Sequence, residues 1–509
     1  MDVFFVDDTI ESLSKTRGVV ALVLTEDCLV SKKFNKLDPR MQALVERFVS
    51  SGIKLKAKNV RELVCPNDVE AQAVYLCNVG PASEFSNLVA REIGANLANA
   101  MLRSGFGKSL DDLTIAGEFS SGVNTEFSDY VADVAFGFML RNYAFDRYIA
   151  DSKDSSKGNL TLEKLTVCCA NATLAKQDFE RYCAIVTGVH WARDLTNEPG
   201  NVLTTTEFVH RISELSDVGI GVEILGERQL EEIGMRALLA VGAGSEHESY
   251  VGIMKWQGGK DPESQPICLV GKGVCFDTGG VSIKPASKME EMIADMGGAG
   301  LVAGLMKTIA LLKLPLNVVG LVGLAENMPD GKAQRPGDIV KALSGTTIEV
   351  INTDAEGRMV LADVLWYAQS IYKPSMLMDF ATLTGAIIIA LGEENAGIFS
   401  NNEALAEKVQ KASSQSGEKV WRLPLSEKYA KLNDSKVADI KNSGGRSGGS
   451  ISAAEFLHKF VKDDMPWVHF DIAGMSYQTS ETTYAPRGAT GWGVTLFETF
   501  LRNICSEQN

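Results

Sequence analysis

The sequence predicts a two-domain α/β protein in which each domain is a mixed β-sheet sandwiched between helices, the C-terminal domain being the larger. Three observations support this fold class. At 509 residues the chain is longer than one ordinary domain. Apolar runs of strand length alternate with amphipathic helical segments, as in layered α/β folds. Apolar residues make up 45% of the chain and charged residues 23%, which is typical of globular proteins.

The first domain is expected over residues 1–170. Helices are expected at 40–50, 85–103 and 131–148, and a polar loop at 151–159. A helix pattern at 175–193 lies within a predicted linking segment, 171–196. Strands are expected at GVVALVLTED (18–27), AQAVYLCNVG (71–80), LDDLTIAGEF (110–119) and LEKLTVCCAN (162–171).

The second domain is expected over residues 197–509. Helices are predicted at 297–312, at 357–371 and at PGDIVKAL (336–343), where an early proline is compatible with a helix start. Polar residues follow several strands, which is where open α/β sheets place their sites. The predicted strands are GVEILG (221–226), ALLAVGAG (237–244), YVGIMKW (250–256), PICLVGKG (266–273, ending at Lys272), LNVVGLVGLAE (316–326), TTIEVINTD (346–354), SMLMDFATLT (375–384) and PWVHFDIAG (466–474).

Bulk composition excludes several functional classes. The net charge of −15 argues against a broad nucleic-acid interface, which needs a basic face. Nine cysteines, an odd number without zinc spacing, indicate buried thiols in a reducing compartment. The acidic start of the chain lacks a signal-peptide pattern, and glycines or charges interrupt the apolar runs before about 18 residues. We therefore expect a cytoplasmic protein without a membrane span.

Seven charged residues stand among glycines or beside strand-like runs in the second domain: Lys272, Asp277, Lys284, Asp295, Asp354, Glu356 and Arg358. Each has an ordinary structural interpretation. The aspartates suit turns or helix caps, Lys284 and Arg358 suit the surface, and Lys272 suits a salt bridge. Together they indicate more, because buried ions need compensation, and divalent metals supply it for carboxylates. The set predicts a two-metal carboxylate site of a hydrolase.

Asp354 and Glu356 are two residues apart at the end of a predicted strand. If both ended an extended strand, their side chains would point to the same side and face one ion.

Nucleophilic catalysis by a cysteine, serine or histidine is disfavoured. Cys275 has no histidine nearby in sequence to activate it, and His469 alternates with apolar residues like a core histidine. The one GxSxG match, GRSGG (445–449), lies in a Gly/Ser-rich stretch that is typical of a loop and not of a nucleophile elbow between a strand and a helix.

The motifs resemble those of the leucyl aminopeptidase family, also called cytosol aminopeptidases. NTDAEGRMVLADVLWYA (352–368) is similar to the family signature, with Met359 where leucine is usual. VGKGVCFDTGGVSIKP (270–285) resembles its first metal segment, with Cys275 and Thr278 at positions commonly Thr and Ser. RDLTNEPGN, DMGGAG, ENMP, RPGD, ATLTGA, AAEFL and HFDIAG also match, so the resemblance covers roughly residues 190–500.

The resemblance implies site residues and a chemistry. Lys272, Asp277, Asp295 and Glu356 would hold one divalent ion, and Asp277, Asp354 and Glu356 the other, the ions being zinc, manganese, magnesium or cobalt. Lys284 and Arg358 would be catalytic, with bicarbonate bound at the arginine. The substrate pocket would include Met292, Asn352, Thr382, Leu383, Gly385 and Ala473.

The implied activity is removal of N-terminal amino acids, leucine or other apolar residues, from peptides with a free N-terminus, by a two-metal activated water. The implied assembly is a homohexamer. Two alternatives stay open at this point. One is a non-catalytic nucleic-acid-binding or scaffold protein of the same fold, against which the acidic charge and the intact ligand positions argue. The other is a dinuclear phosphatase.

Overall fold

The structure is a computed structural model that describes residues 2–7, 18–26, 39–66, 69–104, 109–118, 130–150 and 160–507. The loop predicted at 151–159 lies outside these residues. The chain forms two compact units. The boundary between them falls between Val186 and Thr187, within one long helix, α5 (Ala172–Asn197). A short C-terminal segment, Glu481–Pro486, belongs to the first unit. The functional division into 1–170, 171–196 and 197–509 stays a prediction.

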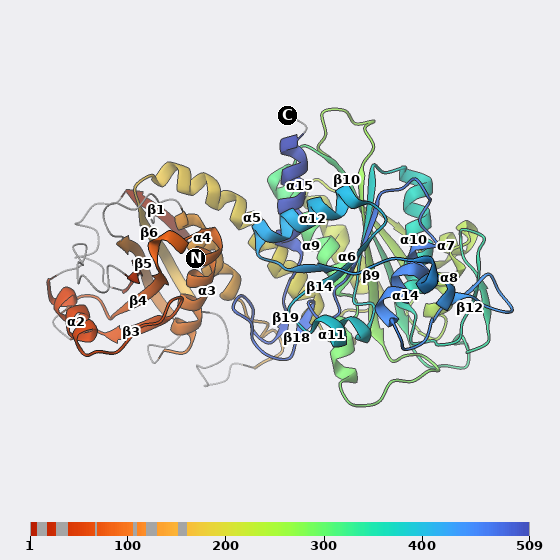
Figure 1. Cartoon of the computed structure of the whole chain (residues 1–509), viewed down its shortest axis with the longest axis horizontal. Helices are drawn as coiled ribbons and strands as arrows, with labels where there is room; N and C mark the ends of the chain where they lie inside the picture. The colour runs from red at the N-terminus through yellow and green to blue at the C-terminus, as the bar shows by residue number, and fades with distance from the viewer. Residues whose placement is uncertain are drawn as a thin grey trace. The chain divides into compact units, whose positions relative to one another are not determined.

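The first unit contains a six-stranded mixed sheet (Figure 1). Its order is β1-β6-β5-β2-β4-β3, and its neighbouring strands are parallel except for the antiparallel pair β3–β4. Helix α2 packs its apolar side against β2, while α3 and α4 pack against each other. The bounds are β1 Asp2–Asp7, β2 Val19–Thr25, α2 Pro39–Ser50, β3 Val60–Val64, β4 Ala73–Gly80, α3 Asn87–Leu102, β5 Ser109–Glu118, α4 Val131–Arg141 and β6 Thr161–Cys169.

The second unit is built on an eight-stranded mixed sheet in the order β15-β14-β17-β13-β9-β10-β8-β7. The central strands β13, β9 and β10 are parallel. The bounds are β7 Gly221–Leu225, β8 Tyr250–Gln257, β9 Ile267–Asp277, β10 Asn317–Asn327, β13 Met376–Ala381, β14 Ala396–Ser400, β15 Val420–Arg422 and β17 Trp467–Asp471.

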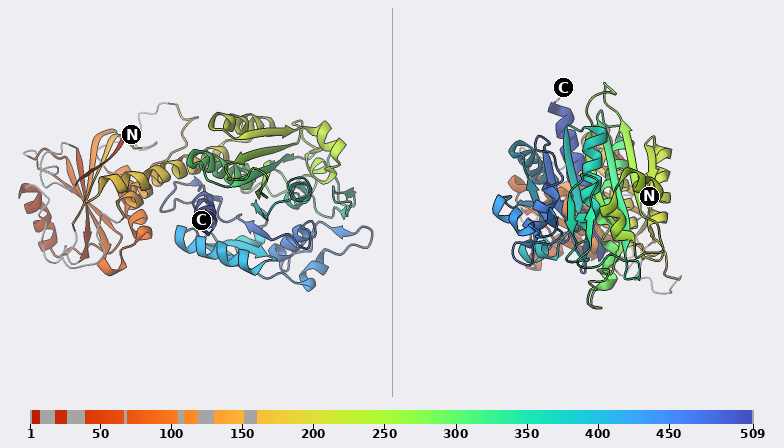
Figure 2. Two further views of the ribbon diagram at one scale, coloured as in Figure 1. Left: turned by 90° about the horizontal axis from the view of Figure 1, so that it is seen from above. Right: turned by 90° about the vertical axis from the view of Figure 1, so that its right-hand side faces the viewer.

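Two apolar cores lie on the two faces of this sheet, and helices cover both (Figure 2). One core includes α6 (Thr205–Ser213), α9 (Gly297–Leu312), α12 (Glu403–Ser416) and α15 (Val494–Glu507). The other includes α7 (Glu227–Ile233), α8 (Arg236–Gly242), α10 (Gly357–Tyr372) and α14 (Gly449–His458). The predicted fold class, a mixed sheet between helices in each part of the chain, is confirmed.

One segment of the described residues, Met289–Leu312, is long and apolar enough to cross a membrane by length and composition. Because 83% of its apolar window is buried inside the protein, it has the character of a core helix. The segment includes α9, which packs against β9 and β13. Gly298 is required there, because a Cβ atom at this position would lie 2.0 Å from the carbonyl oxygen of Phe380.

Three predicted elements differ in the structure, besides the strand expected at 346–354, which is described with the site. The run 237–244 forms most of helix α8 instead of a strand. The run 336–343 contains a strand, β11 (Ile339–Lys341), instead of a helix, and this strand pairs with β12 (Thr347–Glu349). The helix expected at 131–148 ends at Arg141. The remaining short elements are η1 Ala82–Glu84, η3 Glu214–Val218, η4 Met289–Ala294, α11 Gly385–Leu391, α13 Glu427–Ala430, η5 Lys431–Asn433, β16 Ile440–Lys441, β18 Tyr477–Gln478 and β19 Gly488–Ala489.

Candidate metal centre

The candidate site lies at the carboxyl end of β9, the middle strand of the parallel part of the larger sheet. This strand continues five residues beyond its predicted end and therefore carries both Lys272 and Asp277. The Lys272 side chain is only 2% exposed, and its ammonium lies 2.7 Å from Asp295 Oδ1 and 2.8 Å from Glu356 Oε1. It also donates to the carbonyl oxygen of Thr382 at 2.9 Å. Lys272 thus joins three segments that are distant in sequence.

A second lysine meets the carboxylates from the loop that follows β9. The ammonium of Lys284 lies 2.7 Å from Asp277 Oδ2 and 2.5 Å from Asp354 Oδ1. Its side chain is 20% exposed, whereas that of Asp277 is 2% exposed. The Asp354 side chain is 33% exposed, so Lys284 and Asp354 both lie on the solvent side of the buried Asp277.

Three carboxylates come close enough to share a metal ion. One oxygen each of Asp277, Asp354 and Glu356 lies within 4.8 Å of the other two. Asp295 is joined to this group through Lys272, and its Oδ2 atom is buried without a hydrogen-bond partner. Oxygen donors of this kind suit hard divalent ions. The donor set fits the predicted metals, because a buried carboxylate oxygen without a partner is costly unless an ion or a proton compensates it.

The acids and the lysines shift one another's ionisation. Burial, with the charge of Glu356, raises the pKa of Asp277 to about 6. Burial also raises the pKa of Asp295 and of Asp354. Burial opposes ionisation of Glu356 as well, but Lys272 and Lys284 outweigh it and lower the pKa of this carboxyl. Such perturbed groups cluster at functional sites more often than elsewhere.

The turn that carries Asp354 and Glu356 is not the strand expected from the sequence. Strand β12 ends at Glu349, Asp354 lies in a turn, and Glu356 is the residue before helix α10, with helical φ and ψ of −79° and −40°. The argument from alternation along a strand was therefore wrong for this pair. The two carboxylates converge because the chain turns from β12 into α10.

Side chains from other segments hold this turn, and the sequence analysis did not identify them. Asn442 accepts from the backbone N–H of Ile351 at 2.9 Å and donates to the carbonyl oxygen of Asn352 at 2.6 Å. Asn327, at the end of β10, donates to Asp277 Oδ1 at 2.7 Å and to the carbonyl oxygen of Thr353 at 3.1 Å. The motif ENMP contains Asn327, so a signal for it was present, whereas Asn442 stands in a short, unremarkable segment.

Arg358 lies in the first turn of α10 and is 7% exposed. Its Nη1 donates to the carbonyl oxygen of Asn442 at 2.8 Å, and its Nε is buried without a hydrogen-bond partner. Burial lowers the pKa of Arg358 to about 10, so the guanidinium is still charged at neutral pH. A buried cation with a spare donor can bind an anion.

The predicted substrate-pocket residues lie on segments that surround these charges. Thr382 donates from its hydroxyl to Asp295 Oδ1 at 2.8 Å. Leu383 and Ala473 both donate their backbone N–H to Asp471 Oδ1, at 3.1 and 3.4 Å. Asp471 was another residue that the sequence analysis missed. The remaining three are Met292 in η4, Asn352 in the turn before α10, and Gly385 at the start of α11.

Two other candidate groups have structural environments. Cys275 is buried in β9, and burial raises the pKa of its thiol, which disfavours a thiolate nucleophile. His469 is fully buried, and its Nδ1 lies 2.6 Å from Asp379 Oδ1 inside the sheet, as expected of a core histidine.

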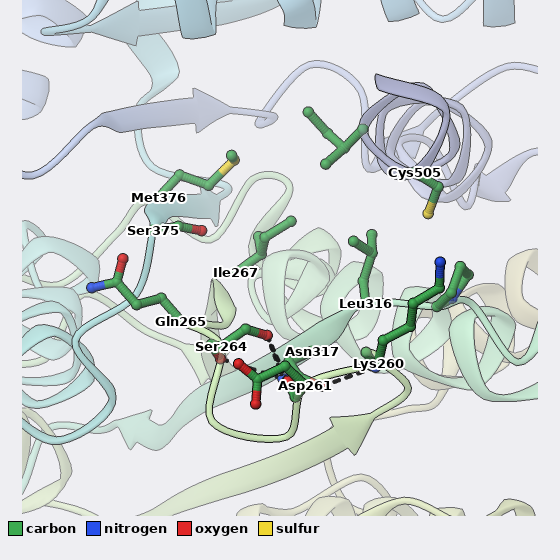
Figure 3. A pocket seen from close by; sticks show the side chains of 13 residues that line it. Lys260, Asp261, Ser264, Gln265, Ile267, Leu316, Asn317, Ser375, Met376 and Cys505 are labelled. Carbon is green, nitrogen blue, oxygen red and sulfur yellow. Dashed lines mark hydrogen bonds between the residues drawn. The ribbon is translucent and has the colours of Figure 1, made fainter. Parts of the chain in front are cut away.

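A cavity of about 440 Å³ lies at the other end of the central strands, at their amino ends (Figure 3). Its lining includes Ile267, Asn317 and Met376, which are the first residues of β9, β10 and β13. It is thus separated from the carboxylates by the length of these strands.

Comparison with known proteins places this site in a family. Residues 190–497 match the model of the cytosol aminopeptidase family, catalytic domain. This chain belongs to the cytosol aminopeptidase family. It is 47% identical over 503 residues to a probable cytosol aminopeptidase of Dinoroseobacter shibae, an alignment covering 98% of each chain. It is 43% identical over 503 residues to one of Cereibacter sphaeroides, again covering 98% of each.

Solved structures agree with this assignment. The bottromycin maturation enzyme BotP in complex with Mn matches with a TM-score of 0.82 and 32% identity, covering 96% of this chain and 100% of that one. A second structure of BotP matches with a TM-score of 0.81, covering 99% of that chain. Membership of the cytosol aminopeptidase family makes this protein a metal-dependent aminopeptidase that acts on peptides, and the scaffold alternative is not favoured.

Proposed function

We propose that this protein is a leucyl aminopeptidase that removes leucine or other apolar residues from the N-terminus of peptides with two divalent ions. The observation that carries the proposal is the convergence of Asp277, Asp354 and Glu356 within 4.8 Å, beside Asp295 and Lys272. Asp277, Asp295, Glu356 and Lys272 would hold one ion, with Lys272 binding as a neutral amine after losing its proton, and Asp277, Asp354 and Glu356 would hold the other. Zinc and manganese are the favoured ions, with magnesium and cobalt as further candidates.

The ions would supply Lewis acidity and a water of lowered pKa when bound. Lys284 would act on the substrate. Burial disfavours its charged form, but Asp277 and the other acids outweigh burial and raise its pKa, so it stays protonated. A protonated, partly exposed ammonium can donate to the oxygen of the scissile carbonyl while negative charge develops there.

Arg358 would bind an anion rather than transfer its own proton, because its guanidinium is charged at neutral pH. Its buried Nε supports binding of bicarbonate, which would supply a general base. Thr382, Leu383, Gly385, Ala473, Met292 and Asn352 would line the substrate pocket. Apolar Met292 and Leu383 favour an apolar N-terminal side chain.

We also propose that the protein assembles as a homohexamer in the cytoplasm. The assembly would be checked by analytical ultracentrifugation of the full chain, where a mass other than six chains would contradict it.

The activity is tested with the Mn²⁺-loaded protein and leucine amide. Asp354→Ala and Glu356→Ala should each abolish release of leucine while the fold, followed by circular dichroism, is retained. Glu394→Ala, which removes an exposed acid of the same unit, is the control and should leave activity unchanged. Full activity of either site variant would contradict the proposal. Turnover of a phosphomonoester in place of leucine amide would favour a dinuclear phosphatase.

A further inference from the structure

The chain between β12 and α10 carries two of the candidate ligands without regular secondary structure. Residues 350–356 separate Glu349 from Gly357, and they hold Asp354 and Glu356. Backbone N–H and C=O groups outside helices and sheets need other partners when they are buried. The position of both carboxylates therefore depends on whatever side chains supply those partners.

Asn442 supplies several of them from one fully buried side chain. Its Oδ1 accepts from the N–H groups of Ile351 and Asn352, at 2.9 and 3.3 Å. Its Nδ2 donates to the carbonyl oxygens of Asn352 and Ala355, at 2.6 and 3.4 Å. The amide thus binds both ends of the turn that presents Asp354, and both its donor and its acceptor sides are used.

The main chain of Asn442 is fixed in turn. It directly follows β16, which pairs with β12, and its N–H donates to the carbonyl oxygen of Glu349 at 2.9 Å. Its own carbonyl oxygen accepts from Arg358 Nη1 at 2.8 Å. One residue therefore contacts the end of the strand, the turn and the first turn of the helix.

We propose that Asn442 is a positioning residue, which sets where Asp354 and Glu356 lie relative to Arg358 and thereby sets the metal affinity of the site. The inference rests on the proposed function for the identity of the metal ligands. The Asn442 amide hydrogen-bonds to backbone groups and to none of the candidate ligand side chains. Its effect passes through the backbone of residues 351–355, because its amide hydrogen bonds end there.

Asn442→Asp is the sharpest variant, since it keeps the shape of the side chain and replaces the Nδ2 donor by an oxygen. That oxygen would face the carbonyl oxygens of Asn352 and Ala355, so the turn must move. Outer partners of metal ligands typically contribute about 10- to 100-fold to metal affinity. We expect the Kd for Mn²⁺, measured by calorimetry on the full-length chain, to rise at least about tenfold.

Asn317, at the amino end of β10 in the same sheet, offers a matched control. It is also a buried asparagine that braces a loop, accepting from the N–H of Gly259 at 3.0 Å and donating to the carbonyl oxygen of Asp261 at 2.9 Å. Figure 3 shows Asn317 beside Asp261 and Ser264 in the lining of the remote cavity. Asn317→Asp should lower the Tm as Asn442→Asp does, and it should leave the Kd for Mn²⁺ and kcat within about twofold of wild type.

The Mn²⁺ Kd decides the matter. If it rises in Asn442→Asp and not in Asn317→Asp, the positioning role is supported, and part of the lost kcat should return at high Mn²⁺ concentration. If both variants keep their affinity, or both lose it in proportion to their Tm, Asn442 is a structural residue only. Asn442→Ser and Asn317→Ser replace the pair if either aspartate variant does not fold. A wild type that binds Mn²⁺ but releases no leucine would contradict the proposed function while leaving the comparison of affinities intact.

Discussion

Lys272 is the clearest case at the scale of single residues, because a fully buried ammonium is stable only among opposite charges. Burial disfavours its charged form, but Asp295 and Glu356 outweigh burial and raise its pKa above the ordinary value. The lysine in turn makes it possible to bury both acids. Each partner is therefore required by the others.

Lys272→Met keeps the length of the side chain and removes the charge. We expect it to lower the free energy of unfolding of the chelator-treated protein by about 3–5 kcal/mol, as when one partner of a buried ion pair is lost. Urea denaturation measures this loss. Lys419→Met, which breaks an exposed ion pair with Glu394, should change stability little. Equal losses for the two variants would show that Lys272 is not the counter-ion of the buried acids.

Asp277 gives a pH dependence with a definite sign. Its pKa in the folded chain is about 6, against an ordinary value of 3.8. A raised pKa means that the folded state favours the protonated acid. Protonated Asp277 therefore contributes to the free energy of unfolding below pH 3.8, and this contribution is lost as the pH rises through 6. Asp277→Asn mimics the protonated form. In chelator, wild type should lose stability relative to Asp277→Asn between pH 4 and pH 7.

Metal binding should show the opposite trend, because the ligand must be deprotonated. The affinity of wild type for Mn²⁺ should therefore increase over the same pH range. Calorimetric titration at pH 5 and pH 7 measures it. A relative stability of wild type that increases between pH 4 and pH 7 would contradict the assigned environment of Asp277.

At the scale of elements, the long buried strands and helices were predictable, since β9, β10, α9 and α10 have continuous apolar runs of characteristic length. The short elements were not. An eight-residue apolar run such as 237–244 fits a strand and a buried helix equally well, and its packing against α10 selects the helix. Strand β11 forms through pairing with β12. The proline at the start of 336–343, which favoured a helix, carries no information about this pairing.

The candidate site was predictable as a set of residues and not as a geometry. Lysines and acids beside glycines and strand ends identified all seven charged members. The convergence of Asp354 and Glu356 could not be predicted, because it depends on a turn held by Asn327 and Asn442 from other segments. Hydrogen bonds over 26 and 90 residues of sequence leave no periodic pattern.

The contact of α9 with the sheet yields a prediction for this helix. A methyl group at Gly298 would meet the carbonyl oxygen of Phe380 at 2.0 Å, so Gly298→Ala must displace the start of the helix. Helix propensity favours alanine by about 1 kcal/mol, but overpacking against backbone costs about 1–3 kcal/mol or more. We expect a net loss of stability in urea denaturation. Gly331→Ala, where nothing lies within 4 Å, is the control and should be close to neutral.

At the scale of the whole molecule, all the candidate ligands belong to one of the two compact units. Lys272, Asp277, Asp295, Asp354 and Glu356 lie within Thr187–Ser480, and the other unit contributes none of them. A ligand stabilises only the folded unit that binds it, by an amount that grows with its concentration relative to Kd. Metal should therefore act unequally on the two units.

We expect calorimetry of the full chain to reveal this difference. Mn²⁺ at about 100 times its Kd should stabilise the larger unit by about 2.7 kcal/mol for each ion bound and shift its unfolding to higher temperature. The smaller unit should unfold where it does in chelator, and its transition can be assigned by the buried pair Arg91 and Asp133, since Asp133→Asn should lower that transition alone. Glu356→Ala, which removes a proposed ligand of both ions, should abolish the Mn²⁺ shift. A single transition in wild type that Mn²⁺ shifts as a whole would contradict this expectation, because it would mean that the units unfold as one cooperative body and that metal bound to one stabilises both.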